Sequence, residues 1–352
     1  MDSEKVMADQ RVDYVKLGAG VLVVILALFA MFRPPDPTGR VPVTIQTTMA
    51  RTPMAVALQT QGGVVTPGGA VVPAAPVADQ PFWVLALVGF AIGCYGTIVG
   101  IGGGPLILPI LVFFYGWENE LLVATSLFIV FLNALSGCAG YAMQKRIDYK
   151  GGIKFTLAAM PGAFISSYIH HLVNLTFFDI IFGIFLVFLA GYTFFSVGKL
   201  DKNAHEKQKQ LKAAKAGGFR RVKFMDNFGI KYDYYSNDKL GISMNLLLGF
   251  FCGFLGIGGG VFQVPILIFL LYYPTHVATA TSHFVTLLTC AVALLPHIFL
   301  GNVMYNEAGW MGVGVVVGAQ VGARIASKLN TKVTLYLFII ILVVFAIKLF
   351  LR

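Results

Sequence analysis

Long apolar segments alternate with short polar breaks along most of this chain. A first apolar run covers Val15–Phe32, and a much longer one extends from Phe82 to Gly198. Apolar segments resume at Leu240 and continue to the end of the sequence. Runs of about 18 or more apolar residues are typical of helices that cross a membrane. The pattern therefore predicts an all-α polytopic membrane protein that includes an N-terminal transmembrane anchor.

The polar breaks divide the chain into five expected parts. The stretch Arg33–Pro81 is rich in Pro, Gly, Thr and Val, as a mobile linker would be, with room for a short strand. The stretch Lys199–Lys239 is polar and basic, with helical propensity in its first half, which indicates a soluble insert. In chain order we expect an N-terminal cytoplasmic segment and transmembrane anchor (1–32), a Pro/Gly-rich periplasmic linker (33–81), transmembrane repeat 1 (82–198), a basic cytoplasmic insert (199–239) and transmembrane repeat 2 (240–352).

Composition agrees with a membrane location. Hydrophobic residues make up 57% of the chain and charged residues only 12%, and the mean hydropathy is +0.78. The net charge of +10 comes from basic residues that lie between apolar segments, a pattern typical of membrane orientation and not of nucleic-acid binding. We therefore expect the lipid bilayer, and no nucleic acid, as a partner. The four cysteines all lie in apolar segments without metal-ligand spacing, and are interpreted as small buried side chains.

The apolar region is a duplication. The motif GIGGG occurs at Gly100–Gly104 and again at Gly256–Gly260, an offset of 156 residues. The same offset, without a gap, carries the ATS motif at Ala124 onto Ala280 and relates Phe128 to Phe284. Residues from about 82 to 198 and from about 240 to 350 are therefore two copies of one unit.

The distribution of basic residues predicts that the two copies have opposite orientations in the membrane. In copy 1 the loop Lys145–Lys154 is basic, whereas the equivalent loop of copy 2, around Asn302–Glu307, has no Lys or Arg. Inversion requires an odd number of crossings per copy. This fits if each GIGGG segment is a hairpin of two half-helices, since 82–116 would be about 50 Å long as a single helix. We therefore expect inverted-topology repeats with broken helices.

The consecutive glycines point to an anion site. Glycine is costly inside a helix, so three in a row mark a deliberate break, and Pro105 fits the first position of a following half-helix. The positive dipole end and free N–H groups at such a terminus attract anions, and no side chain blocks their approach. Two facing termini form a recurrent substrate site in inverted-repeat transporters. The alternative is that the glycines only permit close helix packing. The candidate contacts are Gly102, Gly103, Gly104, Gly258, Gly259 and Gly260.

The duplicated GIGGGxxxxP motif followed by ATS resembles the TauE/SafE family of sulfite exporters, also called the four-toluene-sulfonate uptake permease family. The resemblance covers nearly all of residues 82–350, but not the N-terminal anchor, the linker or most of the insert. It implies secondary transport of small sulfur-containing anions or organic acids, and leaves the individual substrate open.

Several polar residues in apolar helices are further candidates. Hydroxyl groups after each half-helix could donate to an oxyanion or bond back to helix carbonyls. Asn133 and its equivalent Thr289 return to the level of the glycines, and Gln263 is an unusual polar residue in a half-helix. His283 is the best-placed ionisable residue of the membrane core, with a hydrogen bond to a neighbouring hydroxyl as the structural alternative. The set comprises Thr125, Ser126, Asn133, Gln263, Thr281, Ser282 and His283.

These features predict a multi-pass protein of the bacterial inner membrane that moves a small anion by alternating access. An anion channel on the same fold is the alternative. An enzyme is not expected, since the membrane segments lack paired carboxylates and metal-ligand constellations, and neither a cofactor nor a metal is expected. A homo-oligomer is left open, as are the substrate, the direction of transport and the coupling ion.

Overall fold

The computed structural model describes residues 81–115, 119–169, 219–256 and 258–329, together with short pieces at 59–60, 63–65, 71–73, 187, 190–191, 194–195, 332–334, 336–340 and 343. The predicted N-terminal anchor at 1–32 and the first half of the basic insert lie outside the described residues. In the predicted linker, β1 (Gln59–Thr60), β2 (Gly63–Val65) and β3 (Val71–Pro73) pair as a small antiparallel sheet.

The described part of copy 1 consists of four helices. They are α2 (Phe82–Val99), α3 (Gly104–Tyr115), α4 (Asn119–Met143) and α5 (Tyr149–Ile169). The GIGGG segment separates α2 from α3, because Gly100 adopts a left-handed conformation (φ 89°) that ends α2. The break in the helix that the glycines predict is therefore present. The half-helix begins at Gly104, one residue earlier than the predicted Pro105.

Copy 2 repeats this order of elements. It comprises α7 (Asp238–Leu255), α8 (Gly260–Pro265) with its π-helical continuation η2 (Ile266–Leu270), α9 (Thr275–Phe299) and α10 (Tyr305–Ala326). The side chain of Asn237 caps α7 by accepting from the backbone N–H of Leu240 at 3.2 Å, and Gly256 (φ 67°) ends the helix. The two copies thus break their helices at equivalent glycines.

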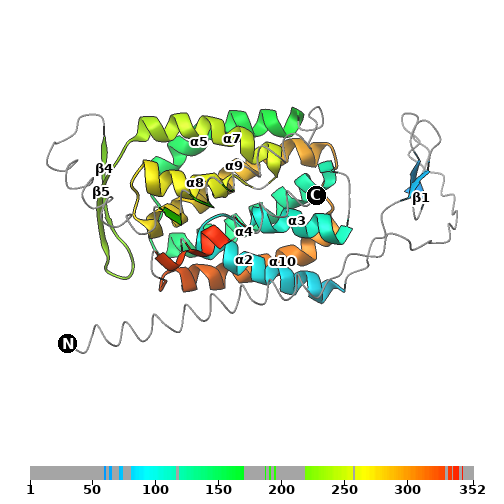
Figure 1. Cartoon of the computed structure of the whole chain (residues 1–352), viewed down its shortest axis with the longest axis horizontal. Coiled ribbons are helices and arrows are strands. Elements are labelled where there is room, and N and C mark those ends of the chain that lie inside the picture. The colour runs from blue at the N-terminus through cyan, green and yellow to red at the C-terminus, as the bar shows by residue number, and fades with distance from the viewer. Residues whose placement is uncertain are drawn as a thin grey trace.

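Helices from different copies pair along the two sides of the bundle. Figure 1 shows α2 beside α10 on one side and α5 beside α7 on the other, with the remaining helices between them. A Cβ at Gly93 would meet the carbonyl of Val315, and a Cβ at the equivalent Gly249 would meet the carbonyl of Ala159. These small residues allow close backbone contact across each pair. Each copy therefore packs its first helix, α2 or α7, against α10 or α5 of the other.

The central helices α4 and α9 are held by matching contacts. Thr125, near the start of α4, accepts a hydrogen bond from the N–H of Met304, just before α10, at 3.2 Å. The equivalent Thr281, near the start of α9, accepts from the N–H of Asp148, just before α5, at 3.1 Å. The start of α4 thus lies at the end of α9, and the start of α9 at the end of α4, so the two helices are antiparallel.

The fold is that of a multi-pass membrane protein, mostly helical in the described residues. Four of its helices are long and apolar enough to cross a membrane: α2, α4, α9 and α10. Large apolar side chains such as Leu157, Val313 and Val317 are exposed on the outside of the bundle, as expected of a surface that faces lipid. The four cysteines are buried and free, which confirms their interpretation as small core side chains.

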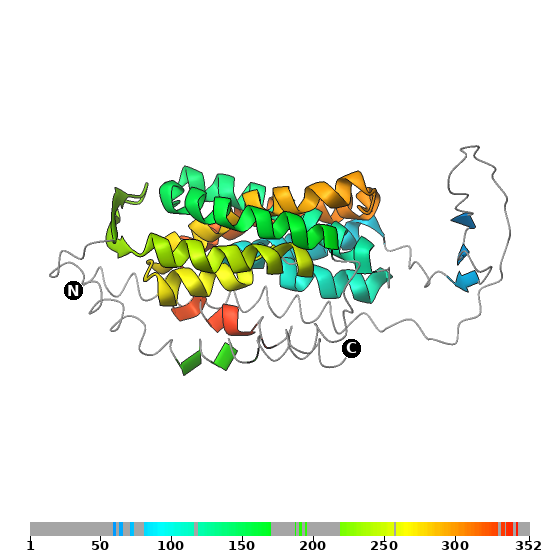
Figure 2. The ribbon, with the colours of Figure 1, turned by 90° about the horizontal axis from the view of Figure 1, so that it is seen from above.

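The second half of the basic insert is a β-hairpin. Strands β4 (Arg220–Met225) and β5 (Lys231–Ser236) pair in antiparallel register, with Arg220 opposite Ser236. Figure 2 shows this hairpin at one end of the helix bundle. The sequence indicates helical propensity in the first half of the insert, and the strands of the second half were not predicted.

Candidate functional site

The two GIGGG turns meet inside the bundle. A Cβ at Gly102 would lie 3.3 Å from both Thr286 Cγ2 and Val130 Cγ1, and a Cβ at Gly258 would meet the same two side chains. Gly260 packs directly against the backbone of Ile101. The glycine turns of the two copies are therefore neighbours around Val130 and Thr286. All thirteen candidate residues predicted from the sequence are buried, including the six turn glycines.

Each glycine turn is tied to the other copy by a serine. Ser126 donates its hydroxyl to the carbonyl of Gly256 at 2.9 Å, and the equivalent Ser282 donates to the carbonyl of Gly100, also at 2.9 Å. A serine hydroxyl has one proton to donate, so in this arrangement each serine donates its proton to the carbonyl of a glycine turn. The predicted Thr125 and Thr281 likewise accept backbone N–H groups from loops of the opposite copy. These four residues thus position the turns and helix ends.

A small pocket lies beside the turn of copy 2. Its lining includes Gly258 and Gly259 of the turn, Gln263 of α8, and Thr286 and Thr289 of α9, with Asn245 of α7 opposite. The pocket has a volume of about 10 Å³, roughly the space that one water molecule requires. Of the predicted residues, the structure therefore brings Gly258, Gly259 and Gln263 together here, next to Thr289.

The equivalent position in copy 1 is organised differently. Thr97 donates its hydroxyl to Asn133 Oδ1 at 3.0 Å, which fixes the amide beside the turn. A Cβ at Gly103 would lie 3.2 Å from Asn133 Nδ2, so Asn133 is at the level of the glycines, as its position along the helix predicts. The amide nitrogen itself makes no hydrogen bond within the described part of the chain.

His283 lies outside the pocket lining. Its ring packs edge-on to Tyr141, with centroids 5.5 Å apart, and fills the space next to Gly137 of α4. This places the histidine at the contact between α4 and α9. Sequence reasoning missed two lining residues, Asn245 and Thr286. Each is a polar side chain in an apolar helix, and copy 1 has Gly89 in place of Asn245 and Val130 in place of Thr286. This difference between the copies is the signal that could have identified them.

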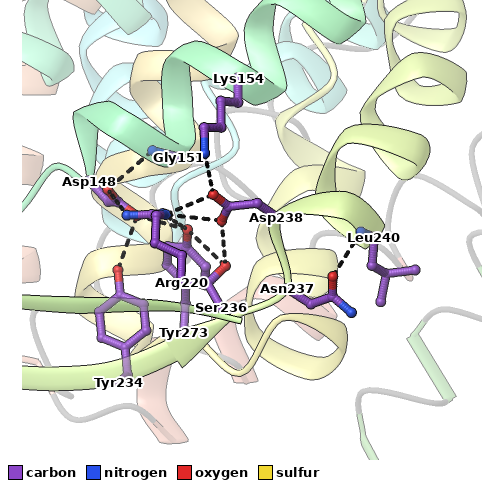
Figure 3. A network of polar contacts seen from close by, with 10 residues as sticks. All are labelled: Asp148, Gly151, Lys154, Arg220, Tyr234, Ser236, Asn237, Asp238, Leu240 and Tyr273. Atoms are coloured by element: carbon purple, nitrogen blue, oxygen red, sulfur yellow. Dashed lines mark hydrogen bonds and ion pairs between the residues drawn. The ribbon is translucent and has the colours of Figure 1, made fainter. Parts of the chain in front are cut away.

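A polar network joins the β-hairpin to the helix ends, as Figure 3 shows. Arg220 Nη2 of β4 lies 2.5 Å from Asp148 Oδ2 before α5, and Arg220 Nε lies 2.8 Å from Asp238 Oδ2 at the start of α7. The hydroxyl of Tyr273, just before α9, donates to Asp148 at 2.9 Å, and Lys154 Nζ lies 2.7 Å from Asp238. Burial alone would lower the pKa of Arg220, but its bonds to Asp148 and Asp238 outweigh this and raise it. The guanidinium therefore links copy 1 and copy 2 through the insert.

A second, deeper ion pair fastens the tip of the hairpin. Arg146 Nε lies 2.9 Å from Asp226 Oδ2, both side chains are buried, and the guanidinium stacks over Phe228 at 4.8 Å. Burial raises the pKa of Asp226, but the N–H of Ile230 and the contact with Arg146 have the larger combined effect and lower it. The hairpin is thus held at both of its ends.

Comparison with known proteins agrees with this architecture. The family described as "Sulfite exporter TauE/SafE" matches residues 6–144 and 85–349. The chain is 31% identical over 234 residues to "Probable membrane transporter protein YunE" of Bacillus subtilis, covering 64% of this chain and 82% of that protein. It is 29% identical over 222 residues to a probable membrane transporter protein of Methanocaldococcus jannaschii, covering 61% of this chain and 71% of that protein. No solved structure matches. These matches indicate a membrane transporter and not an enzyme, and the chain belongs to the TauE/SafE sulfite exporter family.

Proposed function

We propose that this protein is a secondary transporter that carries a small sulfur-containing or organic anion across the bacterial inner membrane by alternating access. The observation that carries the proposal is the meeting of the two glycine turns inside the bundle, next to a pocket with polar side chains. Half-helices that begin at such turns direct their first N–H groups toward the same region, where a buried anion gains most from them. The family assignment supports the sulfur-containing class of substrate.

The two copies, in this proposal, are inverted-topology repeats. The antiparallel arrangement of α4 and α9 supports it, as do the paired contacts that equivalent residues make across the copies. Aromatic pairs follow the same rule: Phe128 packs edge-on to Tyr305, and Phe284 packs edge-on to Tyr149. Such a twofold relation gives the site two equivalent routes, one toward each face of the membrane. Alternating access follows if the two routes open in turn.

The test is transport by the purified chain in proteoliposomes. Sulfite and a set of small sulfonates and organic acids are supplied on one side, and uptake is measured against concentration and against ion gradients. We expect flux that saturates and that depends on a gradient, together with counterflow of the preferred anion. Flux that rises linearly with concentration and follows only the membrane potential would indicate an anion channel, and absence of flux for every anion would contradict the proposal.

Substitution of the turn glycines is a poor test of this site. Gly102, Gly103, Gly258 and Gly259 all have positive φ values between 71° and 80°, a conformation that a side chain with a Cβ adopts only with strain. A loss of binding in Gly103→Val would therefore be mixed with a loss of folding. Residues that contribute side chains to the pocket separate the two effects.

A further inference from the structure

The pocket beside the copy 2 turn holds four polar side chains that lack partners. Asn245 Oδ1, Gln263 Nε2, Thr286 Oγ1 and Thr289 Oγ1 are buried, and none of them hydrogen-bonds to another described residue. All four residues line the same pocket. A buried polar group without a partner costs free energy, so four of them around one space must find a partner there. The pocket has room for about one water molecule, and a ligand that offers matching hydrogen-bonding groups would replace that water.

Copy 1 keeps only one polar residue of this cluster, Asn133, at the position equivalent to Thr289. At the positions equivalent to Gln263, Thr286 and Asn245 it carries Ile107, Val130 and Gly89, respectively. The contacts that hold the copies together are matched, whereas these pocket positions differ. A site shared equally between the copies would place polar groups in both. The polar lining of the pocket therefore comes from copy 2, while copy 1 contributes Ala159.

The hydrogen-bonding capacity of the pocket defines the chemistry of its ligand. Asn245 Nδ2 donates to the carbonyl of Gly241 at 2.9 Å, which orients the amide so that its oxygen remains as an acceptor in the pocket. Gln263 Nε2 can only donate, and the two threonine hydroxyls can donate as well. A matching ligand needs several acceptor oxygens and also one hydrogen to donate to Asn245.

The charge of the lining restricts the ligand further. The side chains that line the pocket among the described residues carry no formal charge. Neutral donors and backbone N–H groups can stabilise one buried negative charge, but a second one would raise the desolvation cost steeply. At about 10 Å³ the pocket must widen to admit any anion, and a compact inorganic ion requires less widening than a bulky organic one.

On this basis we propose that copy 2 holds a single substrate site, formed by Asn245, Gln263, Thr286 and Thr289, that selects a small monoanionic oxyanion still carrying a proton, such as hydrogen sulfite. The inference rests on the proposed transport function and adds the position of the site and the protonation state of its substrate.

Two substitutions test the position. Gln263→Ile and Thr286→Val give the pocket the side chains that copy 1 has at the equivalent positions, with little change in volume. We expect each to weaken the apparent affinity for sulfite in proteoliposomes at least about tenfold, as a buried site loses a donor. The control is Thr156→Val, because the hydroxyl of Thr156 is also buried and unpartnered but lies outside this pocket. It should keep the affinity of the unmodified protein.

The protonation state is tested by the pH dependence of affinity. Hydrogen sulfite loses its proton near neutral pH and becomes the sulfite dianion, so the apparent affinity for total sulfite should fall as the pH rises through neutrality. Asn245→Ala should flatten this dependence. Methanesulfonate keeps one charge throughout and has no proton to donate. It should bind at least about tenfold more weakly and without this pH dependence. The titratable groups beside the pocket among the described residues are the thiols of Cys252 and Cys290, and a similar pH dependence for methanesulfonate would assign the effect to the protein and contradict the requirement for a proton.

The outcomes separate the two proposals. If the unmodified protein transports sulfite and the pocket variants, shown to be monodisperse and equally heat-stable, keep its affinity, the pocket is not the substrate site and the transport function stands. If affinity for sulfite rises with pH, or methanesulfonate binds as well as sulfite, the requirement for a proton is wrong. If the unmodified protein transports no anion, the proposed function fails as well.

Discussion

Substitution of Gly318 by alanine tests how tightly α10 of copy 2 packs against α2 of copy 1. A Cβ at this position would overlap the carbonyl oxygen of Phe90 and lie 2.9 Å from the backbone nitrogen of Cys94, where ordinary contact begins at 3.4 Å. The carbonyl oxygen of Phe90 is the closer of the two and sets the requirement. Because both neighbours are backbone atoms of α2, they cannot turn aside, and α2 and α10 must separate by about 1 Å. A gap of that size forfeits up to about half of the dispersion energy of each contact between the two helices.

The expected result is a loss of stability without a loss of substrate affinity. Overfilling a tight contact costs about 1–3 kcal/mol, which exceeds the gain of about 1 kcal/mol from replacing glycine by alanine in a helix. Gly309→Ala is the matched control, because the site lies in the same helix α10 and a Cβ there would have nothing within 4 Å. Thermal unfolding of the purified proteins in detergent should show Gly318→Ala melting several degrees lower, and Gly309→Ala melting at or above the temperature of the unmodified protein. Equal melting temperatures for the two variants would refute the tight contact between α2 and α10 at Gly318.

Three further predictions concern the copies and the hairpin. Cysteines placed in the loops 145–150 and 302–307 should be labelled from opposite sides of the membrane; labelling of both from one side would rule out inverted repeats. Ser126→Ala and Ser282→Ala should each destabilise the protein by about 1 kcal/mol in thermal unfolding, since each removes an equivalent bond to a glycine turn; a clear difference between them would show that the turns are held unequally. Because the pKa of Asp226 is lowered, its stabilising contribution is complete above the ordinary value of 3.8 and is lost as the pH falls below it. The protection of the β4–β5 amides, measured as exchange relative to the intrinsic rate at each pH, should therefore stay constant down to mildly acidic pH and fall only under stronger acid. A loss of protection near neutral pH would contradict the role of this ion pair.

The sequence predicts the helix breaks well, for a physical reason. Gly100 and Gly256 end their helices because glycine accepts a left-handed backbone, a property that is local and visible in the sequence. The repeat offset shows which residues are equivalent, but the bonds that Ser126 and Ser282 make to the turn of the opposite copy were not predicted, because they depend on how the copies pack.

The hairpin and the pocket were harder to foresee. The many basic residues of the insert indicate a soluble, charged segment and say nothing of strands. The strand signal is present but short: Val222 and Phe224 alternate with polar residues, and Gly229 lies at the turn. That Asn245 and Thr286 face one space depends on how α7 and α9 pack, which no local pattern encodes.

The crossed serine bonds have a consequence for the ancestry of the fold. Ser126 holds the turn of copy 2 and Ser282 holds the turn of copy 1, so neither copy secures its own. Contacts of this kind are those of a symmetric dimer interface, in which the same surface patch is used twice. A half-length chain with a single GIGGG segment could therefore complete its turn only by pairing with a second, antiparallel molecule. Fusion of two such halves removes the need for identical partners, and it leaves one half free to acquire polar side chains while the other keeps apolar ones.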